Sequence, residues 1–121
     1  MRIVVRLLGL IAVTTFATAP AHTESLDQSI AYLLDYIAKS HAVFIRNGVR
    51  HTPAEAVAHI KDKAAYFKSK IKTPEDFIRL AASTSFLTGS PYLVIAPGRK
   101  EMRLDLWLSE ALRAHRAATH S

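Results

Sequence analysis

Apolar residues recur at helical spacing in four segments of the chain. The first segment carries five of them on one face: Leu26, Ile30, Leu33, Leu34 and Ile37. Ser25, with Gln28 three positions later, forms a capping box, in which each side chain bonds the other residue's free backbone N–H. The pattern predicts a helix that begins after Ser25 and stops near Ser40.

Two further helices are expected to begin at Thr-Pro pairs. Thr52 and Glu55 form a second capping box around Pro53, whose missing N–H costs nothing in a first turn. The same chemistry recurs at 73–76. The apolar faces that follow are Ala56, Val57, Ile60, Ala64 and Phe67 in one helix, and Phe77, Ile78, Ala81 and Ala82 in the other. A fourth helix is expected over about 102–117, with Leu104, Trp107, Leu108, Ala111 and Leu112 as its buried face.

Short β-branched and aromatic runs predict three strands. Residues 43–45 and 49–51 flank Asn47-Gly48, the pair best suited to the positive φ angles of a two-residue hairpin turn. Residues 92–96 form a third run, which ends at Pro97-Gly98. The predicted fold class is therefore α+β: four helices packed on a small antiparallel sheet made of a short hairpin plus one further strand.

The first residues predict export. Arg2 and Arg6 precede an apolar run over 7–17, and Ala19 and Ala21 supply the small side chains that signal peptidase requires. The run is shorter than the roughly 20 residues of a membrane-spanning helix. We expect a signal peptide over 1–21, cleaved near Ala21, and a single mature α+β domain over 22–121 in the periplasm.

Composition narrows the function classes. The formal net charge of +6 includes Arg2 and Arg6, and the remaining basic residues form no block of like charge, so nucleic acid is not an expected partner. The chain has no cysteine, which excludes disulfides, thiolate metal sites and a lipid-modified cysteine. We expect no cofactor and no stable membrane insertion after signal cleavage.

One stretch of about half the mature chain resembles a known family. The residues that carry the resemblance are Phe44-Ile45-Arg46-Asn47-Gly48, His51-Thr52, Glu55-Ala56, His59-Ile60, Lys63, Thr73, Glu75, Phe77-Ile78, Ala82-Ser83, Ser85, Thr88-Gly89, Pro91-Tyr92 and Pro97-Gly98. In this order they resemble the domain of unknown function 5329 family of small, exported, YfeK-like bacterial proteins. The resemblance implies a periplasmic address and no assigned activity. The first helix and everything after Gly98 lie outside it.

His51, Glu55, His59 and Lys63 are spaced four apart, which places the last three on one ridge of a helix. The apolar stripe sets Glu55 toward solvent and puts His59 and Lys63 at the border of the core, where an imidazole can bind a ligand or transfer a proton. A structural interpretation stands beside this one. In it Glu55 caps the helix, His59 bonds a buried polar group, and Lys63 extends its ammonium to solvent.

Two other groups complete the candidate ligand site. Arg46 and Asn47 lie at the hairpin tip, where a guanidinium can hold a carboxylate or phosphate through paired N–H donors. Ser83 and Ser85 belong to a hydroxyl-rich connection before the third strand, and Tyr92 is the first residue of that strand. For both groups the structural alternative is a role in turn formation and loop hydrogen bonding.

These residues do not form a complete catalytic set, so we assign none of them a catalytic role. We expect a non-enzymatic binding or interaction module whose partner is a periplasmic protein or a small anionic ligand. The alternative is a small periplasmic hydrolase that uses a Glu55/His59 acid–base pair or a His51/Glu55/His59 metal site.

Overall fold

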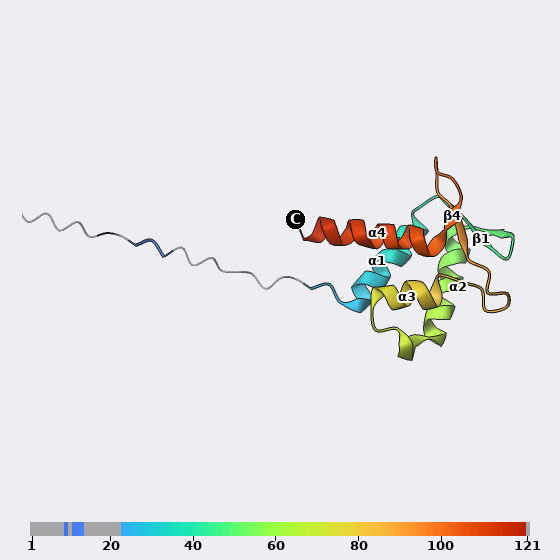
Figure 1. Cartoon of the computed structure of the whole chain (residues 1–121), viewed down its shortest axis with the longest axis horizontal. Coiled ribbons are helices and arrows are strands. Elements are labelled where there is room, and N and C mark those ends of the chain that lie inside the picture. Colours follow the sequence, from blue (N-terminus) through green and yellow to red (C-terminus); the bar gives the residue numbers. More distant parts are fainter. Residues whose placement is uncertain (1–8, 10, 14–22, 121) are drawn as a thin grey trace, which may run out of the picture.

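The computed structural model describes residues 9, 11–13 and 23–120. Most of the predicted signal peptide, including Arg2, Arg6, Ala19 and Ala21, lies outside the described residues. The elements in chain order are α1 (Leu26–Ala38), β1 (Val43–Arg46), β2 (Val49–His51), α2 (Pro53–Tyr66), the 3₁₀ helix η1 (Lys68–Lys70), α3 (Pro74–Ala81), β3 (Leu93–Ile95), β4 (Met102–Arg103) and α4 (Leu104–Thr119). This arrangement confirms the α+β class (Figure 1).

The predicted helix starts are confirmed. Ser25 and Gln28 form the capping box of α1, and Thr52 and Glu55 form that of α2. The Thr73 side chain accepts a hydrogen bond from the backbone N–H of Asp76 at the start of α3. These side chains satisfy N–H groups that have no partner within the helix.

The sheet has four strands in the order β2-β1-β3-β4, all antiparallel. The predicted hairpin is confirmed, and Asn47 and Gly48 both take the positive φ angles of its turn, at 51° and 75°. The fourth strand corrects the sequence prediction. Met102 and Arg103, expected within the last helix, pair instead with β3, and α4 begins only at Leu104.

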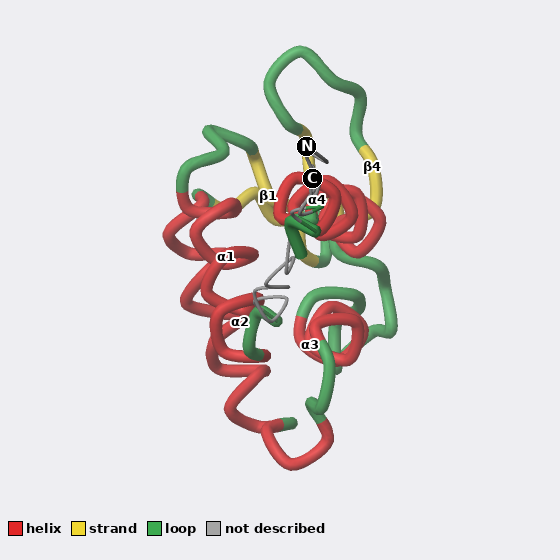
Figure 2. The backbone as a smooth tube through the Cα atoms, turned by 90° about the vertical axis from the view of Figure 1, so that its left-hand side faces the viewer, coloured by secondary structure: helices red, strands yellow, loops and turns green. Residues whose placement is uncertain are grey.

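The helices cover one face of this sheet. Phe44 and Val94 are buried against them, while Val43, Ile45, Leu93 and Ile95 on the other face are half-buried. Figure 2 shows α1 and α2 side by side, with α3 and α4 completing the helical layer. All five predicted core residues of α4 are buried, and Trp107 packs edge-on against Phe44. Among the described residues, no helix has both the length and the apolar character needed to cross a membrane.

The residues before α1 are fixed to the C-terminal part of α4. The Glu24 carboxylate accepts a hydrogen bond from Ser29 Oγ at 2.7 Å and contacts Nε2 of His115 at 2.7 Å. The His115 ring also stacks on Tyr32 of α1, with the ring centroids 3.7 Å apart. This contact brings together residues that are far apart in the sequence.

Candidate functional site

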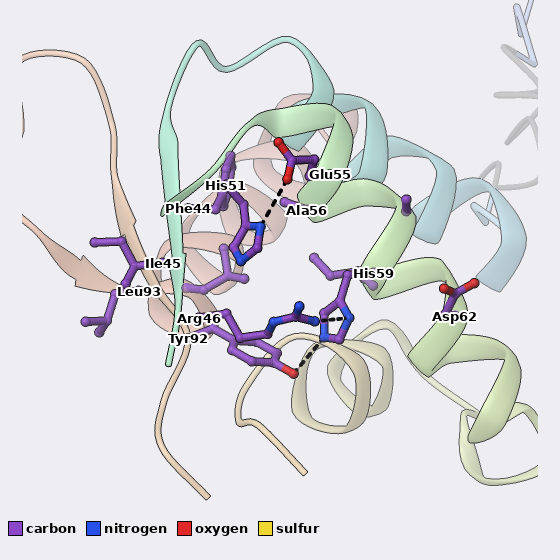
Figure 3. Close-up of a pocket in the computed structure, with 13 residues that line it drawn as sticks. Phe44, Ile45, Arg46, His51, Glu55, Ala56, His59, Asp62, Tyr92 and Leu93 are labelled. Atoms are coloured by element: carbon purple, nitrogen blue, oxygen red, sulfur yellow. Dashed lines mark hydrogen bonds and ion pairs between the residues drawn. The ribbon is translucent and has the colours of Figure 1, made fainter. Parts of the chain in front are cut away.

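Arg46, His59 and Tyr92 meet at the end of the hairpin, where β1, α2 and the segment before β3 come together (Figure 3). Arg46 Nη1 lies 2.5 Å from His59 Nδ1, and His59 Nε2 lies 2.9 Å from the Tyr92 hydroxyl. A guanidinium only donates, so Nδ1 of His59 accepts, and the ring proton on Nε2 is donated to Tyr92. The contacts therefore select one neutral tautomer of His59.

Lys63 approaches the same hydroxyl from one turn further along α2. Its ammonium donates to Tyr92 Oη at 3.0 Å and to the carbonyl oxygen of Thr84 at 2.5 Å. The side chain was expected at the border of the core, yet Lys63 is only 4% exposed. The reason is that the segment from Ser83 to Tyr92 folds over α2 and covers it, with the Phe86 ring centroid 4.5 Å from Nζ.

In the part of the chain that the structure describes, the cations of this cluster have no carboxylate partner. None of the ion pairs among the described residues involves Arg46 or Lys63. Burial lowers the pKa of His59, and the charges of Arg46 and Lys63 lower it further, against a smaller opposing effect of Asp62. Burial, and then the Arg46 charge, also lower the pKa of Lys63, while burial raises the pKa of Tyr92.

A cavity of about 320 Å³ opens beside these groups, and we call it the Arg46 cavity. Its polar wall is formed by Arg46, His59 and Tyr92. The apolar lining residues are Phe44, Ile45, Ala56, Ala58, Ile60, Leu93 and Leu104. Two carboxylates, Glu55 and Asp62, also line it, and Figure 3 shows both set apart from the Arg46–His59–Tyr92 contact. The cavity therefore combines hydrogen-bond donors with an apolar wall.

His51 and Glu55 form a separate pair. His51 Nδ1 lies 3.2 Å from the Glu55 carboxylate, whose pKa is lowered first by this hydrogen bond and then by Thr52. Nε2 of His51 is enclosed and has no hydrogen-bond partner in the part of the chain that the structure describes. His51 also lines the cavity, and its Nδ1 atom is paired with the Glu55 carboxylate.

This pairing bears on the Glu55/His59 pair and the His51/Glu55/His59 set named for a hydrolase. No hydrogen bond or ion pair joins Glu55 to His59, and both ring nitrogens of His59 are occupied by Arg46 and Tyr92. Within the described ranges, no three His, Asp or Glu side chains form a group that could hold a metal. Glu55 is thus paired with His51 and the helix start, and His59 with Arg46 and Tyr92.

The hydroxyl-rich segment is fixed to the hairpin tip. Asn47 Nδ2 donates to Ser85 Oγ at 3.0 Å, and Thr88 Oγ1 donates to Asn47 Oδ1 at 2.7 Å. The other candidate, Ser83, is buried and donates to the carbonyl oxygen of Ile78. Asn47 and Ser85 therefore hold the segment that covers Lys63, and the polar atoms of Ser83 are not directed at the cavity.

Two groups at this cluster escaped sequence reasoning. They are the Thr84 carbonyl oxygen, which accepts from Lys63, and the Phe86 ring, which lies over the same ammonium. A backbone carbonyl carries no residue-type signal. Phe86, which stands with Leu87 as an apolar residue within a polar connection, was a visible indication that this segment packs against another part of the chain.

Comparisons with known proteins agree with the sequence resemblance and extend it. A family model described as "Family of unknown function (DUF5329)" matches residues 24–116, which include α1 and most of α4. The chain is also 37% identical over 84 residues to the "Uncharacterized protein YfeK" of Salmonella typhimurium strain LT2, covering 69% of this chain and 68% of that protein. No solved structure is significantly similar to this chain.

Proposed function

The chain belongs to the DUF5329 family of unknown function, and we propose that it is an exported, non-enzymatic binding module that holds a small organic anion in the Arg46 cavity. The observation that carries this proposal is that the half-buried Arg46 lines the cavity without a carboxylate partner among the described residues, while the buried Lys63, which does not line the cavity, bonds Tyr92 and Thr84. A buried cation is costly unless an opposite charge or good hydrogen bonds compensate it. A bound anion supplies that charge.

The hydrogen-bond directions favour an acceptor. The Tyr92 oxygen already accepts from His59 and Lys63, so its own proton is free to be donated to a ligand. Arg46 uses one N–H on His59 and has further N–H groups in its planar fork. Both donors line the cavity, and together they match a carboxylate.

The rest of the cavity favours an apolar ligand body. Phe44, Ile60 and Leu104 form part of its wall, and a pocket with a few convergent polar groups on an apolar surface is typical of small-molecule sites. A volume of about 320 Å³ limits the ligand to a small molecule. We therefore propose a monocarboxylate with a short hydrocarbon chain as the ligand class.

Isothermal titration calorimetry with acetate, butanoate, hexanoate and octanoate tests this proposal. Each added methylene that reaches the apolar wall should tighten binding about fourfold, from roughly 0.8 kcal/mol of burial. Arg46→Gln should weaken binding about tenfold or more, because a hydrogen bond to a charged group contributes about 1.5–3 kcal/mol. Hexanamide and hexanol should bind more weakly than hexanoate.

Arg50→Gln is the matched control. Arg50 lies on the neighbouring strand, is exposed, and is not among the residues that line the cavity, so its replacement should leave hexanoate binding unchanged. Equal binding of hexanoate and hexanol, or equal losses in the two arginine variants, would show that Arg46 does not recognise the anion.

A further inference from the structure

A second feature of the surface is independent of the Arg46 cavity. Tyr66 and Phe67 at the C-terminal end of α2 contact Phe86 in the covering segment, and the three ring centroids lie 4.9, 5.2 and 5.4 Å apart. Tyr66 is 76% exposed, Phe86 59% and the adjoining Leu87 90%. We call these four residues the aromatic end. Large apolar side chains that gather on a surface, instead of being scattered, mark an interaction site.

Lysines are frequent in the sequence next to the aromatic end. Residues 61–72 contain five lysines and one aspartate. Lys68 and Lys70 lie in η1, directly after Phe67, and both are exposed. Neither of them, nor Lys61 or Lys72, takes part in an ion pair among the described residues. The ammonium of Lys63, beneath the Phe86 ring, adds positive charge at the base of this surface.

We propose that the aromatic end binds reversibly to a membrane surface that carries anionic lipid headgroups. Tyrosine and other aromatic side chains favour the boundary between headgroups and acyl chains, and a leucine exposed as fully as Leu87 can enter the apolar region. Lysines close to such a surface are attracted by its negative potential. The lysines therefore suit the anionic headgroups, and the aromatic and leucine side chains suit the acyl-chain boundary beneath them.

The charge argues against a second copy as the occupant. A symmetric dimer would set the same surface of two molecules face to face, and the lysines of both would repel each other. Figure 1 places η1 and the segment over 82–92 at the lower end and side of α2, away from the C-terminal end of α4.

Sedimentation with lipid vesicles tests the proposal. The protein is purified from the cells that produce it, so that all variants carry the same amino-terminal end. Wild type should sediment with vesicles of equal parts phosphatidylglycerol and phosphatidylcholine, and at least about tenfold less with phosphatidylcholine alone. Leu87→Ser should weaken binding to the mixed vesicles about tenfold, because burial of the leucine side chain is lost.

Two further variants separate charge from apolar contact. Lys68→Gln with Lys70→Gln should weaken binding to the anionic vesicles about fivefold or more and remove most of the salt dependence. Leu106→Ser replaces an exposed leucine of α4, outside the aromatic end, and should leave binding unchanged. Because these side chains are exposed, circular dichroism should show the same fold in every variant.

Three outcomes would overturn the proposal. They are no sedimentation of wild type with anionic vesicles, equal binding to both vesicle types, and equal losses in Leu87→Ser and Leu106→Ser. A wild-type dimer in size-exclusion chromatography that Leu87→Ser converts to a monomer would also overturn it and assign the surface to a second copy. None of these results depends on whether the Arg46 cavity binds an anion.

Discussion

The neutral imidazole of His59 makes the stability of the protein sensitive to pH. Arg46 donates to Nδ1, and burial, followed by the charge of Arg46, lowers the pKa of the ring. A lowered folded-state pKa contributes stability that is complete above the ordinary value of about 6.5 and is lost as pH falls through the lowered value. In thermal melts, wild type should lose more stability than His59→Gln between about pH 7 and pH 5. Parallel curves for the two proteins would contradict a lowered pKa.

The Tyr92 hydroxyl is the common acceptor of this cluster. Tyr92→Phe removes the oxygen that accepts from His59 Nε2 and Lys63 Nζ, and it leaves one half-buried and one buried donor short of a partner. We expect the free energy of unfolding, measured with urea, to fall by about 1–3 kcal/mol. Tyr66→Phe is the control because the Tyr66 ring is largely exposed, and it should change stability little. A Tyr92→Phe variant as stable as this control would show that the hydrogen bonds accepted by the Tyr92 hydroxyl do not contribute to the free energy of unfolding.

The sequence predicted which residues of α2 share a face, but it did not predict how deeply Lys63 is buried. Four-residue spacing places His59 and Lys63 on one ridge of α2, and in the structure both contact the Tyr92 hydroxyl. The same spacing did not reveal that Glu55 would turn to His51, because both orientations satisfy the capping box. Lys63 is buried by a segment some twenty residues away, which no periodicity within α2 records.

Among the elements, the β1–β2 hairpin forms a tight turn and also holds the segment over 85–90 through the Asn47 side chain. Mutation can separate these two roles. Gly48→Ala strains the turn, since φ is 75° at that position, and should cost about 1–2 kcal/mol. Asn47→Ala strains the turn similarly and also removes both side-chain bonds to Ser85 and Thr88. Hydrogen exchange over residues 85–90 should therefore accelerate in Asn47→Ala but not in Gly48→Ala.

Equal acceleration in the two hairpin variants would mean that the turn itself, and not the Asn47 side chain, fixes the segment. The comparison also bears on Lys63, because the segment that Asn47 holds is the one that supplies the Thr84 carbonyl oxygen.

Local sequence signals were sufficient for the helices and the hairpin but not for the last strand. Capping residues and a two-residue turn act through neighbours along the chain, so their pattern is visible in the sequence. Met102 and Arg103 directly precede the apolar helical pattern that begins at Leu104, so helix was predicted there. Their strand conformation depends on pairing with Leu93 and Val94, some ten residues away.

For the whole molecule, export is the prediction with the simplest test. The arginines, apolar run and small residues over 2–21 predict cleavage after Ala21. In a bacterial host with a periplasm, osmotic shock should release the protein, and amino-terminal sequencing should begin at His22. Ala19→Arg should block processing, because the cleavage site requires small side chains. Retention of uncleaved wild-type protein in the cytoplasm would contradict export.

The contact of Glu24 with Ser29 and His115 determines where a label or tether can be attached to the protein. It holds the start of α1 and the last turns of α4 next to each other, on the opposite side of the molecule from the hairpin (Figure 1). A fluorophore, affinity tag or surface tether joined at either place therefore leaves the Arg46 cavity unobstructed. A short peptide linking the two places would close the backbone into a ring without stretching it, so that the chain could be reopened at the exposed 97–101 turn.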